Sequence, residues 1–327
     1  MISFDGEKNI PLSSFEGIRN YFPLMNSNLG CHALALLVAC IWGSTFVASK
    51  VLLMAGLTPA QIMTFRFLIA WLLMLPWCHK QLKTNIKDEL WFMSLGLSGG
   101  SFYFLAENTA VQLTSATSTV ALLVCTTPIL TALINRMVYR SEHLSSRFMI
   151  GSMVALVGVS LVVFNGVFVL DDDPLVIILS VAASLTWAIY CLIIRKLDKR
   201  YSSAVITRKV FFWGVITMLP VVFCEDLDFR ILANPTVIGT TCFLAIVASL
   251  GCFLAWNIVL KRLGVVVTGN YLYFNPVTSL IAAYLVLDEH ITLLAIIGCF
   301  LTIAGVYLCN KKKKGPSSRR SLSRVLF

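Results

Sequence analysis

The chain carries one pattern twice: EHLSSRFMIGSMVALVGVSL at residues 142–161 and EHITLLAIIGCFLTIAGVYL at residues 289–308. In both copies a Glu-His pair is followed by two glycines at the same spacing, without an insertion. A pattern that returns after nearly half of an apolar chain of 327 residues indicates a duplicated fold. Duplicated membrane folds hold their binding site between the two copies.

The composition predicts an all-α integral membrane protein. Hydrophobic residues make up 58% of the chain and charged residues 13%, whereas soluble domains are about half apolar and about a quarter charged. Most apolar runs have the roughly 20 residues that cross a hydrocarbon layer as a helix, and the short alternating segments of a barrel are not visible. Ten membrane-spanning helices are expected, at residues 32–54, 57–77, 90–111, 114–135, 148–168, 174–194, 208–224, 235–260, 265–287 and 291–310.

The placement of Lys and Arg predicts the orientation of these helices. If the N-terminus is cytosolic, every Lys and Arg except Lys50, Arg66 and Arg230 falls on the cytosolic side. Because positive charge collects in cytosolic loops, we expect a multi-pass protein of the cytoplasmic (inner or plasma) membrane with both termini in the cytosol. This bias explains the net charge of +10, so nucleic acid is not an expected partner.

We divide the chain into four parts. Residues 1–31 are expected to form a polar cytosolic segment, since they lack the apolar core of a signal peptide. Residues 32–168 and 169–310 are expected to form two five-helix repeats, and residues 311–327 a basic cytosolic tail. This tail is expected to lie against anionic lipid headgroups, which attract clustered Lys and Arg.

Further matching residues assign five helices to each repeat. The sequence FLAEN at residues 104–108 matches FLAWN at residues 253–257, which pairs the third helix with the eighth. The first, second and fourth helices are paired with the sixth, seventh and ninth by Trp42 with Trp187, Arg66 with Arg208, and Pro128 with Pro276. Because five is an odd number, the second repeat enters the membrane from the opposite side, and the two repeats are inverted.

These residues resemble the EamA family of the drug/metabolite transporter superfamily. The resemblance covers roughly residues 32–310. It rests on WGSTF at residues 42–46, Arg66, the blocks from Pro128 to Glu142 and from Pro276 to Glu289, and the glycine-containing fifth helix of each repeat. It implies a transporter of small metabolites and leaves the substrate open, because the family handles amino acids, nucleotides and other metabolites.

Glu107 is the one acidic residue that the predicted spans place inside the membrane, at a position that the second repeat fills with Trp256. An ionisable side chain in hydrocarbon is costly unless it is paired or faces water, so Glu107 is a candidate for substrate binding or coupling. Lys50 and Arg66 are the cations expected nearby. We expect Glu107 to balance one of them and leave the other for an anionic or carboxylate-bearing substrate. The alternative is a structural ion-pair network.

Aromatic and amide side chains within the spans form a second set of candidates. Binding pockets combine aromatic walls with a few hydrogen-bonding groups, so some of these residues are expected to line a central cavity. Simple packing is the alternative for each of them. The substrate-binding candidates are Trp42, Asn108, Trp187, Tyr190, Trp256 and Asn257, followed by Tyr103, Asn270, Tyr271, Tyr273 and Asn275.

Proline and glycine mark two further features of the repeats. Pro128 and Pro276 lie inside the fourth and ninth predicted helices, where the missing amide hydrogen permits a kink or a gate. The glycines of the opening pattern lie on one face of each fifth helix and allow close helix approach. We expect these glycines to serve as scaffold, with a homodimer seam as the alternative.

The sequence as a whole predicts a secondary transporter, an exporter or exchanger, of small polar or amphipathic metabolites. Alternating access follows from the exchange of conformations between inverted repeats. A dedicated carrier for a nucleotide-like metabolite such as S-adenosylmethionine is the alternative within transport. An intramembrane enzyme or receptor is the alternative from another class, although no nucleophile–base pair, phosphate loop or metal cluster marks an active site. No metal or cofactor is expected.

Overall fold

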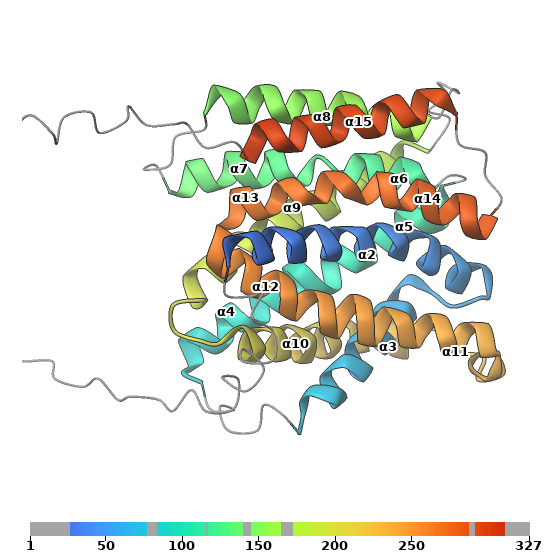
Figure 1. The fold of residues 1–327 in the computed structure, drawn as a ribbon. Coiled ribbons are helices and arrows are strands. Elements are labelled where there is room, and N and C mark those ends of the chain that lie inside the picture. The colour runs from blue at the N-terminus through green and yellow to red at the C-terminus, as the bar shows by residue number, and fades with distance from the viewer. Residues whose placement is uncertain are drawn as a thin grey trace, which may run out of the picture.

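The computed structural model describes residues 27–76, 84–114, 117–139, 145–164, 173–287 and 292–310. These residues form a bundle of ten helical spans (Figure 1). The all-α fold that the sequence predicts, with ten spans in two inverted repeats, is confirmed. Most of the segment 1–31, and the whole of the tail 311–327, lie outside the described residues.

Six spans are single helices and four consist of several helical pieces. Six are long and apolar enough to cross a membrane, and α3 and α8 are shorter apolar helices. In chain order the spans are α2 (Asn28–Met54), α3 (Pro59–Met74), α4–η3–α5 (Ile86–Gly96, Leu97–Ser101, Phe102–Leu113), α6–α7 (Thr117–Val124, Thr127–Val138), α8 (Ser146–Phe164), α9 (Pro174–Leu197), α10 (Ser203–Phe223), α11–η5–α12 (Pro235–Cys242, Phe243–Gly251, Cys252–Leu263), α13–η6–α14 (Val265–Gly269, Asn270–Phe274, Asn275–Leu287) and α15 (Leu293–Asn310). A short 3₁₀ turn, η4 (Ile231–Ala233), precedes α11.

Local capping residues decide where several spans begin. Thr58 forms a capping box with Gln61 ahead of α3, and Ser202 caps α10 by accepting from the Val205 amide. Such caps satisfy backbone N–H groups that have no partner inside the helix. Because of the Ser202 cap, α10 begins five residues before the predicted start at residue 208, so Arg208 and Lys209 lie within this helix.

The two termini of the bundle lie at the same end. In Figure 1, α2 begins and α15 ends on the left side, which we call the termini end; the other side is the opposite end. The paired helices α8 and α15 run in opposite directions side by side. An even number of spans, with the second repeat inverted, produces this arrangement.

The two repeats interleave around the first helix of each. In the first repeat α2 packs against α12 and α14 of the second repeat. In the second repeat α9, the counterpart of α2, packs against α5 and α7 of the first. Each repeat therefore surrounds the leading helix of the other, and the centre of the bundle is shared by both.

Four of the ten spans are interrupted near their middle. Spans three and eight each contain a π-helix, η3 and η5, in matching positions. Spans four and nine are interrupted directly before Pro128 and Pro276, by a turn at residues 125–126 and by the 3₁₀ turn η6. Inside a membrane, such irregular backbone is tolerated where it is buried in protein or lines a cavity.

The glycines of the repeated pattern pack against each other. A methyl group built on Gly158 would lie 2.5 Å from the Thr302 amide nitrogen, and one on Gly298 would lie 2.5 Å from the Gly158 carbonyl oxygen. Gly151 and Gly305 meet in the same way farther along α8 and α15. These glycines therefore join the two repeats within one chain, and this contact occupies the face that a glycine-based seam between two copies would need.

Replacing Gly158 with Ala is expected to destabilise the protein by about 1–3 kcal/mol, because the new methyl group forces the α8 and α15 backbones apart. Thermal unfolding of the purified protein measures the effect. Gly239→Ala is the matched control, since nothing lies within 4 Å of its added methyl group and Ala is favoured over Gly in a helix by about 1 kcal/mol. Equal unfolding midpoints for the two variants would contradict the packing role.

Candidate functional site

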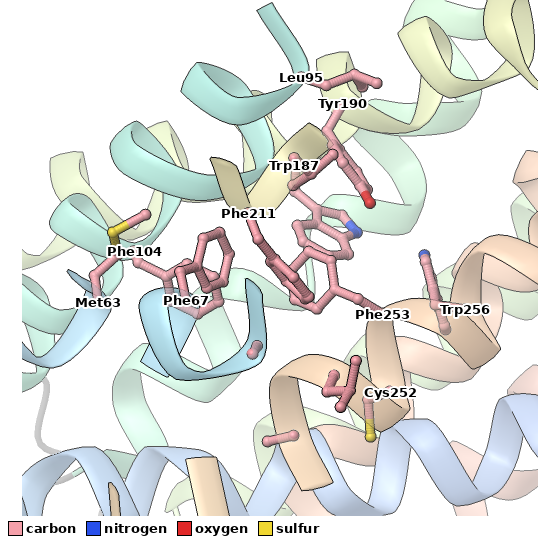
Figure 2. Packing of buried hydrophobic residues seen from close by; sticks show 14 of the residues in the cluster. Met63, Phe67, Leu95, Phe104, Trp187, Tyr190, Phe211, Cys252, Phe253 and Trp256 are labelled. Atoms are coloured by element: carbon pink, nitrogen blue, oxygen red, sulfur yellow. The ribbon is translucent and has the colours of Figure 1, made fainter. Parts of the chain in front are cut away.

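Equivalent aromatic residues of the two repeats meet at the centre of the bundle. Trp42 of α2 and Trp187 of α9 lie edge to face with ring centroids 5.2 Å apart. Phe104 of α5 and its counterpart Phe253 of α12 are 6.4 Å apart. Figure 2 shows Phe253 beside Trp187 and Phe211 in this cluster. The pseudo-two-fold axis that relates the repeats must pass close to these pairs, since symmetry-related residues touch only near their axis.

A small cavity lies beside this aromatic centre. Its volume is about 20 Å³, enough for roughly one water molecule, so a metabolite can enter only if the surrounding helices move. Both repeats contribute to its wall. The lining residues are Trp42, Thr45, Phe46, Arg66, Tyr103, Phe104, Glu107, Val124, Thr127, Trp187, Phe253, Leu272 and Asn275.

Arg66 reaches the cavity from the middle of α3. Its side chain is 1% exposed, and its Nε donates to the Ser249 hydroxyl at 2.8 Å. The guanidinium carbon lies 4.3 Å from the centre of the Phe104 ring, a cation–π contact. Its Nη1 has no hydrogen-bond partner in the part of the chain that the structure describes. A buried donor without a partner is costly, which makes this nitrogen a ready binding point for an acceptor group.

Glu107 enters the same cavity from α5 and is 2% exposed. Tyr103, one helical turn earlier on α5, lines the cavity beside it. The ion pairs within 4.0 Å among the described residues are Asp88 with Arg200 and Glu89 with Lys209. Glu107 and Arg66 thus share a cavity without forming a direct ion pair.

The π-helix η5 holds two side chains of the cavity in place. Its Ser249 hydroxyl receives the hydrogen bond from Arg66, and its Ala248 carbonyl oxygen accepts from Trp42 Nε1 at 2.9 Å. A wide π turn disrupts the regular ladder of backbone hydrogen bonds and is frequent at functional sites. Here it lets span eight bind residues of spans one and two.

A hydrogen-bonded layer closes the centre on the side of the termini end. The Tyr190 hydroxyl donates to Asn257 Oδ1 at 3.1 Å, and Asn257 Nδ2 donates to the Thr207 hydroxyl at 2.7 Å. Trp256 packs on Trp42 with ring centroids 4.9 Å apart and is fully buried. Three of the predicted binding residues, Tyr190, Trp256 and Asn257, therefore lie in this packed layer, which we call the closing layer.

Lys50 and Asn108 lie away from the cavity. Lys50 Nζ donates to the carbonyl oxygens of Val111 at 3.0 Å and Thr114 at 2.7 Å, at the C-terminal end of α5. A cation there satisfies carbonyl groups that have no partner in the helix. Asn108 is completely buried, and neither of its amide atoms has a hydrogen-bond partner among the described residues.

The structure brings residues beside the two predicted prolines to the wall of the cavity, although the prolines themselves do not line it. Thr127 and Val124 flank the interruption before Pro128. Leu272 belongs to the interruption before Pro276, and Asn275 directly follows it. The two interruptions touch each other, because the Cys125 thiol lies 3.4 Å from the Leu272 carbonyl oxygen. Whether either proline acts as a gate stays a prediction.

Six of the fourteen predicted binding residues line the cavity: Trp42, Arg66, Tyr103, Glu107, Trp187 and Asn275. The sequence reasoning missed Thr45, Phe104, Thr127, Ser249 and Phe253. Phe104 and Phe253 could have been found, because they begin the matching sequences FLAEN and FLAWN and equivalent residues can meet at a symmetry axis. Ser249 had no such signal, since its contact with Arg66 depends on the π turn.

The family comparison covers both repeats. The family described as the EamA-like transporter family matches residues 29–164 and again residues 174–311. A solved crystal structure has a TM-score of 0.68 with this chain at 18% sequence identity, covering 86% of this chain and 96% of its own length. This second likeness concerns the fold alone.

Several proteins are similar to this chain over more than half of their length. A protein of Archaeoglobus fulgidus described as an uncharacterized transporter is 26% identical over 88% of this chain and 99% of its own length. The uncharacterized transporter YdfC of Bacillus subtilis is 28% identical over 81% of this chain and 86% of its own. A probable terminal-alkyne amino-acid exporter of Streptantibioticus cattleyicolor is 26% identical over 60% of this chain and 65% of its own.

Replacing Lys50 with Met is expected to destabilise the protein by about 1–3 kcal/mol, because two carbonyl groups lose a charged donor. Unfolding of the purified protein by heat or denaturant tests this expectation. Lys261→Met is the matched control: Lys261 also donates to a carbonyl group, that of Asp198, but is exposed to solvent. A similar loss in both variants would show that the partly buried Lys50 does not act as a cap of α5.

Proposed function

The chain belongs to the EamA-like transporter family, and from this premise we propose that it is a secondary transporter of small polar or amphipathic metabolites. Its membership makes it an integral, multi-pass membrane transporter and points away from an enzyme. The substrate, the direction and the mechanism are the proposed parts.

The observation that carries the proposal is the unpartnered guanidinium nitrogen of Arg66. Its Nη1 is buried and has no hydrogen-bond partner in the described residues, and the residue lines the cavity. Guanidinium groups bind carboxylates strongly because two N–H donors match two oxygens. A cargo with a carboxylate, and with an apolar or aromatic part to contact Trp42, Trp187 and Phe253, fits these surroundings.

Alternating access is the mechanism that the inverted repeats support. The cavity lies on one side of the aromatic centre, while the equivalent space on the other side is filled by the closing layer of Tyr190, Asn257, Thr207 and Trp256. An exchange of conformations between the repeats would loosen this layer and compact the region around Glu107. The cargo would then leave toward the termini end or enter from it.

The direction and orientation rest on the charge distribution and on one relative. Almost all cations lie on the termini side of the predicted spans, which supports cytosolic termini in the cytoplasmic membrane. The similar protein of S. cattleyicolor is described as a probable amino-acid exporter. Export or exchange of amino-acid-like cargo is therefore the favoured activity, and Glu107 is the acidic residue available for proton coupling.

Uptake and efflux by proteoliposomes test the proposal. The purified protein is reconstituted and offered labelled amino acids, nucleotides and S-adenosylmethionine, with and without a pH gradient. Flux of carboxylate-bearing metabolites is expected. Preference for a nucleotide-like compound would favour the alternative cargo, and the absence of flux for every compound would overturn the transporter assignment of this site.

Arg66→Ala is expected to reduce this flux by about tenfold or more, because a buried charge-assisted contact with the cargo is lost. Arg66→Lys should restore part of the flux, since Lys keeps the charge but not the planar pair of donors. Arg230→Ala is the control, because Arg230 is an exposed loop residue at the opposite end. Wild-type flux in Arg66→Ala would remove Arg66 from the binding site.

Asn257→Ala is expected to loosen the closing layer, because it removes both the Tyr190 and the Thr207 hydrogen bonds. The thiol of Cys191, which is 3% exposed beside this layer, should then react faster with a maleimide added from the termini end. Peptide mapping by mass spectrometry measures this rate. Asn108→Ala, which changes the equivalent but unpartnered amide of the first repeat, should leave it unchanged. Equal rates in the two variants would contradict a closing role for Asn257.

A further inference from the structure

The cavity holds one basic and one acidic side chain. Of the residues that line it, Arg66 carries a positive charge and Glu107 a negative one, and the others are neutral aromatic, aliphatic, hydroxyl or amide side chains. Lys50, the other cation of this region, is bound to the end of α5 and does not line the cavity. The site therefore offers one charge of each sign to whatever occupies it.

Each of the two charges keeps the capacity to bind a further group. Arg66 Nε donates to the Ser249 hydroxyl, whereas Nη1 has no partner within the described residues. Glu107 lines the same cavity, and a carboxylate has room for several donors. If Arg66 and Glu107 served only to neutralise each other, a direct ion pair between them would be expected. The structure places both in one cavity without such an ion pair.

The cost of burying charge decides which cargo such a cavity accepts. Both groups are almost completely buried, and an uncompensated charge in such surroundings is strongly disfavoured. A cargo with one carboxylate and one ammonium group places opposite charges against Arg66 and Glu107, so the filled site remains neutral. A cargo with a carboxylate alone leaves the charge of Glu107 unbalanced.

We infer that Glu107 is the residue that sets charge selectivity, so that the cavity prefers zwitterionic cargo and rejects anions of the same size. This inference rests on the proposed function, because it assumes that the cavity is the binding site of the transporter. It goes further by assigning opposite tasks to the two charged residues. Arg66 binds the carboxylate, while Glu107 binds the ammonium group and excludes cargo without one. The position is specific to the first repeat, since Trp256 replaces Glu107 in the second.

The test uses three probes that share one phenyl group: phenylalanine, 3-phenylpropionate and phenethylamine. They carry both charged groups, the carboxylate alone and the ammonium alone. Binding to the full-length protein in nanodiscs is measured at neutral pH by the change in tryptophan fluorescence, because Trp42 and Trp187 form the wall of the cavity. Wild-type protein is expected to bind phenylalanine about tenfold or more tightly than either other probe.

Glu107→Gln should change the selectivity in favour of the anion, 3-phenylpropionate. The site then carries the single positive charge of Arg66, so 3-phenylpropionate should bind about tenfold more tightly than to wild type, while phenylalanine binds more weakly. Glu107→Asp keeps the charge and should keep phenylalanine as the preferred probe. Glu225→Gln is the matched control, because Glu225 accepts a hydrogen bond from Thr58 at the opposite end and lies outside the cavity.

Two results would overturn the inference. One is an unchanged ranking of the three probes in Glu107→Gln, or an equal weakening of all three, in a variant that unfolds at the wild-type temperature. The other is the failure of wild-type protein to bind any of the probes. The proposed function is tested separately, because flux of any metabolite in proteoliposomes supports it whatever the ranking of these probes.

Discussion

Backbone polar groups inside an apolar layer must find partners within the protein, and this constraint shapes the molecule. Most of each span meets it by forming an uninterrupted helix. In four spans the regular α-helix is interrupted near the middle, at η3, at η5 and before the two matching prolines. Side chains from other spans supply hydrogen bonds to the carbonyl groups of these interruptions: Trp42 Nε1 donates to the Ala248 carbonyl oxygen, and the Cys125 thiol donates to the Leu272 carbonyl oxygen. Residues beside the interruptions of spans four and nine line the cavity, and η5 binds two of its side chains, Arg66 and Trp42.

The two repeats are equivalent in outline and different in chemistry. Trp42 meets Trp187 and Phe104 meets Phe253, so the aromatic centre is nearly symmetric. On one side of this centre stand Arg66 and Glu107 with a space between the helices; on the other, Trp256 and the Asn257 hydrogen bonds fill the space. A duplicated scaffold can exchange conformations between its halves, and side chains that differ between the halves give the two states different affinities for a cargo.

Cavity residues were predictable from the sequence where they carry a charge inside an apolar span or where the repeats are symmetric. Arg66 and Glu107 stood out because ionisable side chains are rare in apolar spans, and both line the cavity. Lys50 carried the same signal but lies at the end of α5, since a long flexible side chain can reach carbonyl groups beyond its own helix. Tyr190 and Asn257 are polar and buried like cavity residues, yet they bind each other, and residue type alone does not reveal the partner.

The sequence by itself determined the membrane-spanning helices, their number and the inversion of the repeats. These features follow from apolar length, from the cost of exposing backbone groups to lipid and from the odd number of helices in each repeat, all of which can be counted along the chain. Only the tertiary structure decided which polar residues face a space and which face each other. That choice depends on the interleaving of the repeats, on the π turn that brings Ser249 to Arg66, and on contacts between spans that lie far apart in the sequence.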